Sequence, residues 1–136
     1  MRNIFFPIIF MLLFTACKKQ KHTTQNGLIP VMDCINFSTS NGTITCCLDS
    51  VINDSRCPAN VNCIYAGSAA ARFKITKNSK QQIITLSLKP VSTMPVQYST
   101  EEMVLGYKIS FTALTPYPGL APYNYADYKA ELTIVE

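Results

Sequence analysis

Cysteine is the residue type in this 136-residue chain whose number and spacing point most directly to chemistry. The chain has six cysteines, and five of them fall between positions 34 and 63. Thiols in such a cluster can form disulfides, bind a metal ion or act as nucleophiles. The chain has one histidine, His22, and no C-x2-C or H-x3-H pattern, which disfavours a zinc site, a redox pair and a Cys-His catalytic pair. Disulfide formation is the chemistry that remains.

The acidic residues offer little for hydrolysis. Asp33 interrupts an apolar alternation and is expected at the end of a sheet. Glu101 and Glu102 are neighbours in sequence, whereas the two carboxylates of a glycosidase face each other across a cleft. We therefore expect no catalytic residue, no cofactor and no metal. A small hydrolase that depends on Asp33 or Asp54 is the weaker alternative.

Strand alternation predicts one disulfide. If residues 29–37 and 43–51 form a hairpin with aligned apolar faces, Cys34 lies opposite Cys47 on the other face. Directly opposed residues at a non-hydrogen-bonded position have Cα atoms ~4.5 Å apart, which is close enough for a disulfide.

Three cysteines then remain, and two of them can close a second, shorter loop. Cys57 and Cys63 are separated by the sequence PANVN and are predicted to form this bridge. Cys46 is left as a thiol that points inward and behaves as a small buried hydrophobe. Other pairings of the five cysteines stay open at this point.

Residues 1–16 resemble the signal peptide of a bacterial lipoprotein. Arg2 supplies the positive charge, and residues 4–14 form an apolar run too short to span a hydrocarbon core of ~30 Å. The sequence LFTA stands directly before Cys17, as in a lipobox. The resemblance implies cleavage before Cys17, acylation of its thiol by diacylglycerol and a further acyl chain such as palmitate, and stable anchoring in a membrane.

The sequence from Cys17 to Gly27 is expected to be a flexible linker, because residues 18–27 (KKQKHTTQNG) contain no aliphatic side chain. Many surface-exposed lipoproteins of the Bacteroidetes type have acidic residues after the lipidated cysteine, whereas this chain has lysines. The expected location is therefore the bacterial outer membrane, facing the periplasm. From Leu28 onward the formal charges cancel, so a nucleic-acid partner is not expected.

Apolar residues alternate with polar ones along six short runs of the remaining chain, within residues 29–37, 44–48, 69–75, 84–88, 107–113 and 128–134. Asn, Gly, Pro and Ser separate the runs, a pattern typical of antiparallel all-β domains. We predict one β-sandwich over residues 28–136, immunoglobulin-like or a similar Greek key. The sequence around Tyr128 is similar to the tyrosine corner of immunoglobulin-like domains. Ser99–Glu102 is expected to cap one helical turn.

The most distinctive motif begins at Asp54. The sequence DSRCP, then four residues, then C-x-x-AG resembles a pattern found in an uncharacterised group of small Bacteroidetes-type lipoproteins, whose function is not assigned. Within the motif, Asp54 can start an Asx-turn, and Arg56 can form a salt bridge to Asp54 or contact a partner. Either role makes Asp54 and Arg56 candidate binding residues.

A second candidate surface is rich in tyrosine and proline. Tyr117, Tyr123 and Tyr125 lie near three prolines, and tyrosine is enriched at protein interfaces. In addition, Asp49-Ser50-Val51 is similar to an O-glycosylation site of exported Bacteroidetes proteins, and its modification is left open.

These features together predict a lipid-anchored cell-envelope protein that acts as a binding or structural module and has no enzymatic activity. The expected partners are the membrane, through Cys17, and an envelope protein or a glycan. The main alternative is a secreted-protease inhibitor that presents the Cys57–Cys63 loop, with Arg56 offered to a trypsin-like enzyme.

Overall fold

The computed structural model describes residues 24–88, 98–119 and 122–136. The predicted signal peptide, the lipidation site Cys17 and His22 lie outside these residues. Within the described part of the chain, no helix is long and apolar enough to cross a membrane.

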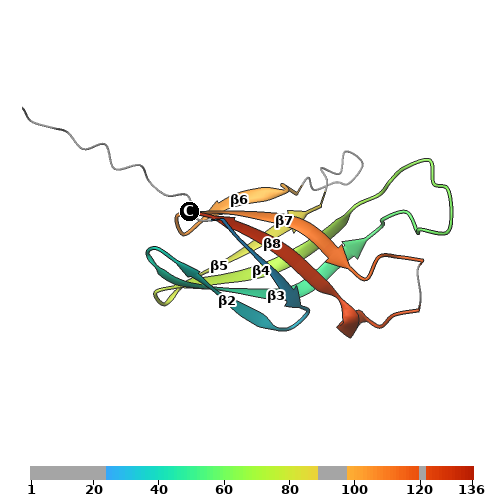
Figure 1. The fold of residues 1–136 in the computed structure, drawn as a ribbon. Coiled ribbons are helices and arrows are strands. Elements are labelled where there is room, and N and C mark those ends of the chain that lie inside the picture. Colours follow the sequence, from blue (N-terminus) through green and yellow to red (C-terminus); the bar gives the residue numbers. More distant parts are fainter. Residues whose placement is uncertain (1–23, 89–97, 120–121) are drawn as a thin grey trace, which may run out of the picture.

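In the described residues, eight strands form two four-stranded sheets, and the paired strands are antiparallel (Figure 1). The strands are β1 (Thr24–Pro30), β2 (Cys34–Thr39), β3 (Gly42–Asp54), β4 (Ala69–Lys77), β5 (Lys80–Ser87), β6 (Glu101–Val104), β7 (Tyr107–Thr115) and β8 (Lys129–Val135). One sheet has the order β1-β8-β7-β6, and the other has the order β2-β3-β4-β5. The predicted all-β sandwich is confirmed, with a more sequential strand order than the interleaved A-B-E-D order of immunoglobulin domains.

One hydrophobic core fills the space between the two sheets. Its members come from both layers, and they include Ile44, Phe73 and Leu86 from one sheet and Ile109 and Leu132 from the other. The rings of Phe73 on β4 and Phe111 on β7 meet edge to face, with centroids 5.3 Å apart. Apolar side chains therefore alternate inward on both sheets, as the period-two pattern predicts.

The predicted register between residues 34–37 and 44–47 is confirmed. β2 and β3 pair with Cys34 opposite Cys47 and Ile35 opposite Cys46. The Cys34–Cys47 disulfide is present, with Cα atoms 3.9 Å apart. Cys46 is a buried free thiol, and burial raises its pKa to about 12. Cys46 therefore stays protonated at neutral pH and is a poor nucleophile.

The predicted single strand over residues 29–37 is wrong, because the chain changes sheets in its middle. β1 pairs with β8 in one sheet, whereas β2 pairs with β3 in the other. The change occurs at Met32, which has a φ of 62° and donates its N–H to the Leu48 carbonyl. Asp33 lies exposed in this crossover, where its carboxylate accepts a hydrogen bond from the Cys34 N–H.

Three smaller expectations also need correction. β1 begins at Thr24, inside the predicted linker, because residues 24–27 pair with β8. Residues 101–104 form strand β6 and not a helical turn. In β7 a register shift between Phe111 and Ala113 turns Leu114, and not Ala113, fully into the core.

Candidate functional site

Asp54 and Arg56 form a buried ion pair where β3 ends. The guanidinium donates two hydrogen bonds to the carboxylate, from Nε to Oδ1 at 2.8 Å and from Nη2 to Oδ2 at 2.7 Å. Each side chain is only 7% exposed. The Arg56 N–H also donates to Asp54 Oδ1 at 3.3 Å, as an Asx-turn requires. The turn between positions 54 and 56 thus brings the two side chains together in a bidentate ion pair.

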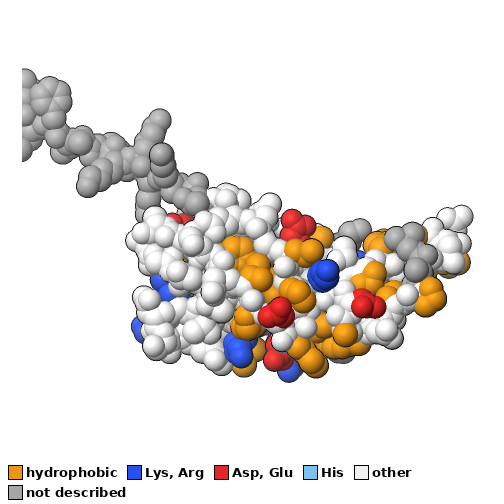
Figure 2. All heavy atoms as spheres, turned by 60° about the horizontal axis from the view of Figure 1, so that its bottom comes forward, with side chains coloured by type: hydrophobic (Ala, Val, Ile, Leu, Met, Phe, Trp, Pro, Cys, Tyr) orange, Lys and Arg blue, Asp and Glu red, His pale blue; other side chains and the backbone are white. Residues whose placement is uncertain are grey.

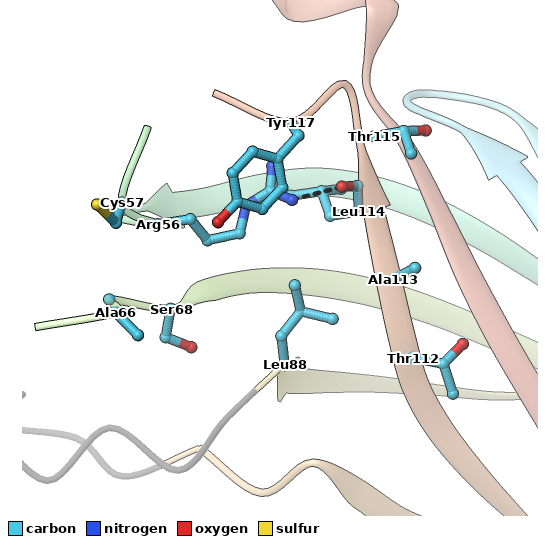
Figure 3. Close-up of a pocket in the computed structure, with 11 residues that line it drawn as sticks. Arg56, Cys57, Ala66, Ser68, Leu88, Thr112, Ala113, Leu114, Thr115 and Tyr117 are labelled. Atoms are coloured by element: carbon cyan, nitrogen blue, oxygen red, sulfur yellow. Dashed lines mark hydrogen bonds between the residues drawn. The ribbon is translucent and has the colours of Figure 1, made fainter. Parts of the chain in front are cut away.

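The same guanidinium ties this segment to the end of β7. Arg56 Nη1 donates to the Leu114 carbonyl, and Nη2 donates to the Pro116 carbonyl at 2.9 Å. The Tyr117 ring covers the guanidinium, with the Arg56 Cζ 4.9 Å from the ring centroid (Figure 3). Arg56 therefore joins two loops that are about sixty residues apart in the sequence.

Tyrosines complete the network on the other side of Asp54. The Tyr128 hydroxyl donates to Asp54 Oδ2 at 3.0 Å and lies 3.1 Å from the Tyr123 hydroxyl. The Tyr123 and Tyr125 rings pack edge to face against Tyr128, with centroids 5.4 and 5.8 Å away. The Tyr125 hydroxyl accepts a hydrogen bond from the Val51 N–H at 2.8 Å. Tyr128 thus bonds to a distant carboxylate, whereas a tyrosine corner bonds to nearby backbone.

This network sets the ionisation of its members. Burial alone would raise the pKa of Asp54, but hydrogen bonds from Arg56 and Tyr128 and the charge of Arg56 outweigh it, so this pKa lies below its ordinary value. Burial and the contacts with Tyr123 and Asp54 raise the pKa of Tyr128 well above its ordinary value. At neutral pH Asp54 is therefore an ionised acceptor for Arg56 and Tyr128. Tyr128 is neutral, so its hydroxyl can donate the hydrogen bond to Asp54.

Beyond the ion pair the chain forms a loop of residues 55–68, called here the stapled loop. The predicted Cys57–Cys63 disulfide closes its first part, residues 57–63, and Ile64 and Tyr65 follow the bridge directly. At its far side Gly67 has a φ of 67°, and a Cβ there would lie 1.7 Å from the Ser55 carbonyl oxygen. The loop can return to β4 only because position 67 has no side chain.

The tip of the stapled loop carries exposed apolar side chains. Ile64 is 93% exposed, Tyr65 77% and Val61 53%. Six of the ten large hydrophobic side chains exposed in the described residues belong to this end of the sandwich, namely Ile52, Val61, Ile64, Tyr65, Tyr117 and Tyr125. Figure 2 shows hydrophobic side chains gathered over the half of the molecule that includes this end. We call this region the stapled end.

A half-open pocket of about 440 Å³ lies at the base of the stapled loop. Its walls are the loop residues 66–68, Leu88 after β5, residues 112–115 of β7, and Arg56 with Tyr117 at one end (Figure 3). Leu88, Ala66, Ala113 and the Tyr117 ring supply its accessible apolar surface. Since the charge of Arg56 is matched by Asp54, the pocket suits a neutral apolar group.

Arg56 is buried, and this burial overturns its predicted role as a residue offered to a trypsin-like protease. A protease-inhibitor loop has to present its arginine to the enzyme, but this guanidinium is engaged with Asp54 and two backbone carbonyls. The expectation that Arg56 bridges to Asp54 is confirmed. The Asp54 carboxylate is bonded to Arg56 and Tyr128, and the hydrolase alternative stays a prediction.

The structure brings the two predicted binding surfaces together. Asp54, Arg56 and Tyr117 lie in one network with Tyr123, and Tyr125 packs against it through Tyr128. Asp33 lies apart from this network, in the sheet crossover. Within the described residues, no group of three or more His, Cys, Asp or Glu side chains could hold a metal ion. Ser50, in the possible glycosylation triplet, lies in β3 next to a register shift.

Sequence reasoning missed Ile64, Tyr65 and the linking role of Tyr128. The only sequence signal for Ile64 and Tyr65 is their place directly after Cys63, within the DSRCP motif region. The similarity to a tyrosine corner indicates a hydrogen bond from the Tyr128 hydroxyl, but its partner, Asp54, depends on the way the two loops meet.

Comparisons with protein-family models, with curated proteins and with solved structures found no match to this chain. The resemblance of the DSRCP motif to a group of small lipoproteins therefore stays a prediction.

Proposed function

We propose that this chain is a lipid-anchored cell-envelope protein whose sandwich is a binding module, with the stapled end as its recognition surface. The observation that carries the proposal is the exposure of Ile64 and Tyr65 on a loop whose base is fixed. Exposed apolar groups that cluster on one end of a soluble domain are typical of interaction sites.

The rigidity of the loop supports a recognition role. A disulfide closes residues 57–63, next to Ile64 and Tyr65, and the ion pair of Asp54 and Arg56 holds the base of the loop against β7. A loop fixed in one conformation loses little entropy when a partner binds, so its apolar contacts contribute more fully to affinity. Tyrosine at the centre of such a surface is a frequent source of binding energy.

Two further features support an exported location. Two disulfides suit an oxidising compartment such as the bacterial periplasm. The lipobox-like sequence before Cys17 supports anchoring in the outer membrane, facing the periplasm. The proposed partner is an envelope protein, with a glycan as the alternative ligand, and catalysis is not part of the proposal.

An affinity capture with matched variants tests the recognition surface. Residues 22–136 contain all eight strands and both disulfides, so this oxidised domain is immobilised and exposed to envelope extract. The test variant is Ile64→Ser with Tyr65→Ser. The control is Ile83→Ser with Met103→Ser, which removes two exposed apolar side chains away from the stapled end.

We expect a partner that binds the wild-type and control domains and is lost from the Ile64→Ser, Tyr65→Ser domain. Reduction of the disulfides should also weaken its retention. A partner retained equally by all these forms would place recognition elsewhere on the sandwich. The absence of any retained protein or glycan would contradict the binding-module proposal.

A further inference from the structure

The end of the sandwich opposite the stapled end is formed by three hairpin turns, together with the start of β1 and the end of β8. Thr24 pairs with Val135, which also pairs with Lys108 at the start of β7. Beside them lie the β2–β3 turn (residues 39–42), the β4–β5 turn (77–80) and the β6–β7 turn (104–107), as Figure 1 shows. We call this region the entry end, because β1 begins here.

Tyr107 joins the three turns of the entry end. It is only 1% exposed, and its hydroxyl lies 2.8 Å from Thr39 Oγ1 in the β2–β3 turn. Lys77 Nζ, from the β4–β5 turn, donates to the same hydroxyl and lies 4.3 Å from the centroid of the Tyr107 ring. Side chains from all three turns thus meet at Tyr107, which gives the Lys77 ammonium group a fixed place at this end.

Lys77 and Lys80 give the entry end a positive charge that no ion pair among the described residues neutralises. Neither ion pair found there involves these two lysines. Glu136 lies at the same end, where its carboxylate accepts hydrogen bonds from the β2–β3 turn. An ammonium group has three donors, and Tyr107 takes one from Lys77, so both lysines can still bind an anion.

A half-open hollow of about 320 Å³ lies between the β4–β5 and β6–β7 turns. It is lined by Lys77, Asn78, Lys80 and Leu105. The two lysines supply cations from one turn, and half-buried Leu105 supplies an aliphatic contact from the other. This combination suits an anionic group that carries an apolar substituent, such as the phosphate of a phospholipid.

The covalent chain places the hollow close to the proposed membrane anchor. Seven residues lead from Cys17 to Thr24, and a fully extended chain of this length spans at most ~25 Å. Lysines occupy positions 18, 19 and 21 of this tether. A protein acylated at Cys17 would thus hold the entry end within reach of the headgroups, and the two lysines of the entry end would add to the three of the tether.

We propose that the entry end docks on the anionic phospholipid headgroups of the membrane that holds the anchor. Lys77 and Lys80 bind lipid phosphates, and Leu105 packs against the adjoining glycerol and acyl carbons. This inference rests on the proposed lipid anchor and names a second contact of the protein with that membrane. Docking at the entry end directs the stapled end away from the lipid, where the proposed recognition surface can meet its partner.

The tether favours lipid over an acidic protein as the occupant. Each lysine near an anionic membrane strengthens binding about fivefold, so two lysines contribute about 25-fold. That is little for a freely diffusing partner. It is sufficient for a headgroup surface that the anchor holds beside the entry end at a high effective concentration.

Vesicle binding of the unacylated chain tests this surface. Residues 17–136 with Cys17→Ser contain all eight strands and both disulfides, and they lack the acyl chains that would bind any vesicle. The oxidised protein is sedimented with vesicles of phosphatidylcholine alone, or of phosphatidylcholine and phosphatidylglycerol in equal amounts. The salt concentration is about 0.1 M, where the Debye length of ~10 Å screens charges far from the membrane.

The test variant is Lys77→Gln with Lys80→Gln. The control, Arg72→Gln with Lys74→Gln, removes the same charge from the outer face of β4. We expect the parent protein to bind the mixed vesicles and not phosphatidylcholine, and the test variant to bind about 25-fold more weakly. The control should change binding by less than about twofold. No binding to the mixed vesicles, unchanged binding by the test variant, or equal weakening in both variants would overturn the proposal.

Two further variants guard against misfolding. Lys80→Gln alone changes an exposed side chain and should weaken binding about fivefold. Lys77→Arg with Lys80→Arg keeps both charges and should bind like the parent protein. Weak binding by the arginine variant in a folded domain, or no effect of Lys80→Gln, would contradict a headgroup site at these two positions.

A mapping experiment leaves the two lysines unchanged. Mixed vesicles that contain a gadolinium-labelled lipid are added to the ¹⁵N-labelled Cys17→Ser chain. We expect the strongest amide broadening in residues 39–42, 77–80 and 104–107, and weaker broadening in the stapled loop. The reverse order would place the stapled end on the membrane and overturn the proposal.

The outcomes for lipid binding and for the anchor can be told apart. Palmitate incorporation at Cys17 without headgroup binding at the entry end would overturn docking and leave the proposed anchor and recognition surface intact. Headgroup binding through Lys77 and Lys80 in a chain that is not acylated at Cys17 would overturn the anchor and leave a headgroup-binding surface.

Discussion

At the scale of single residues, Arg56 connects the parts of the stapled end. Four hydrogen bonds from its guanidinium reach Asp54, Leu114 and Pro116, so one side chain sets the relative position of two loops. A buried ion pair adds little net stability compared with apolar packing, because both charges lose their hydration. The ion pair instead fixes the positions of the loops, since a hydrophobic side chain at position 56 could not form hydrogen bonds to the same three residues.

Removal of one charge from the pair should destabilise the domain strongly. We expect Asp54→Asn or Arg56→Ala to cost about 3–5 kcal/mol in the free energy of unfolding, because each leaves a buried polar partner uncompensated. The double variant Asp54→Asn, Arg56→Met should cost clearly less than the sum of the single variants. Urea unfolding measures all of them, with Arg72→Ala on the exposed face of β4 as control. Strictly additive losses would mean that the two side chains are not coupled.

The ionisation of Asp54 predicts a loss of stability in acid. Its pKa in the folded chain lies below the ordinary value of 3.8, so ionised Asp54 stabilises the fold. This contribution is complete above about pH 5 and disappears as pH falls through the folded pKa. The variant Asp54→Asn, Arg56→Gln, in which neither charge is present, should lose less stability between about pH 5 and pH 2 than the wild type. Thermal unfolding across this range measures it, and Glu102→Gln should keep the wild-type slope.

The local part of this network was predictable from the sequence, and the distant part was not. The two-residue spacing of Asp54 and Arg56 predicts their contact, because a turn brings the two side chains together. The burial of Arg56 depends on Leu114 and Pro116, and no local pattern indicates which loop will cover it. The same limit applies to Tyr128, whose partner Asp54 is seventy-four residues away.

At the scale of elements, strand alternation predicted what depends on neighbouring strands. The register of β2 and β3 follows from matching their apolar faces, and the Cys34–Cys47 pair follows from the register. Alternation did not predict the change of sheets at Met32, because the apolar pattern continues through it without interruption. It also missed β6, whose short, acidic sequence has only Val104 buried.

Position 67 gives a prediction for the stapled loop. We expect Gly67→Ala to destabilise the domain by more than about 2 kcal/mol, because the new Cβ would meet the Ser55 carbonyl as well as strain a positive φ. Gly106→Ala in the β6–β7 turn is the matched control, since position 106 also has a positive φ but open space around its Cβ. It should cost only about 1 kcal/mol. Equal effects in thermal unfolding would mean that Ser55 moves aside freely.

At the scale of the whole molecule, the sandwich has two chemically different ends. Thr24 pairs with Val135 at one end, where Glu136 also accepts hydrogen bonds from Ser40 and Asn41. The stapled end lies at the other end of the strands (Figure 1). A chain anchored through Cys17 would therefore enter the sandwich at the end opposite the proposed recognition surface.

The lipid anchor is tested in the full chain. We expect wild-type protein expressed in a lipoprotein-processing bacterium to incorporate labelled palmitate and to sediment with membranes. Cys17→Ser should lose both properties, because the acyl chains need this thiol. Cys46→Ser serves as control for the loss of a cysteine. Palmitate labelling that persists in Cys17→Ser would contradict the proposed anchor.

The pairing of β1 with β8 has a consequence for the order in which the protein is made. β1 contains residues 24–30 and β8 contains residues 129–135, so the first sheet stays incomplete until more than a hundred further residues have been synthesised. Contacts of such long sequence separation form late and slowly. The second sheet, β2-β3-β4-β5, lies within residues 34–87, so the first sheet, and with it the two-layer core, is the part of the fold that has to wait for the last strand.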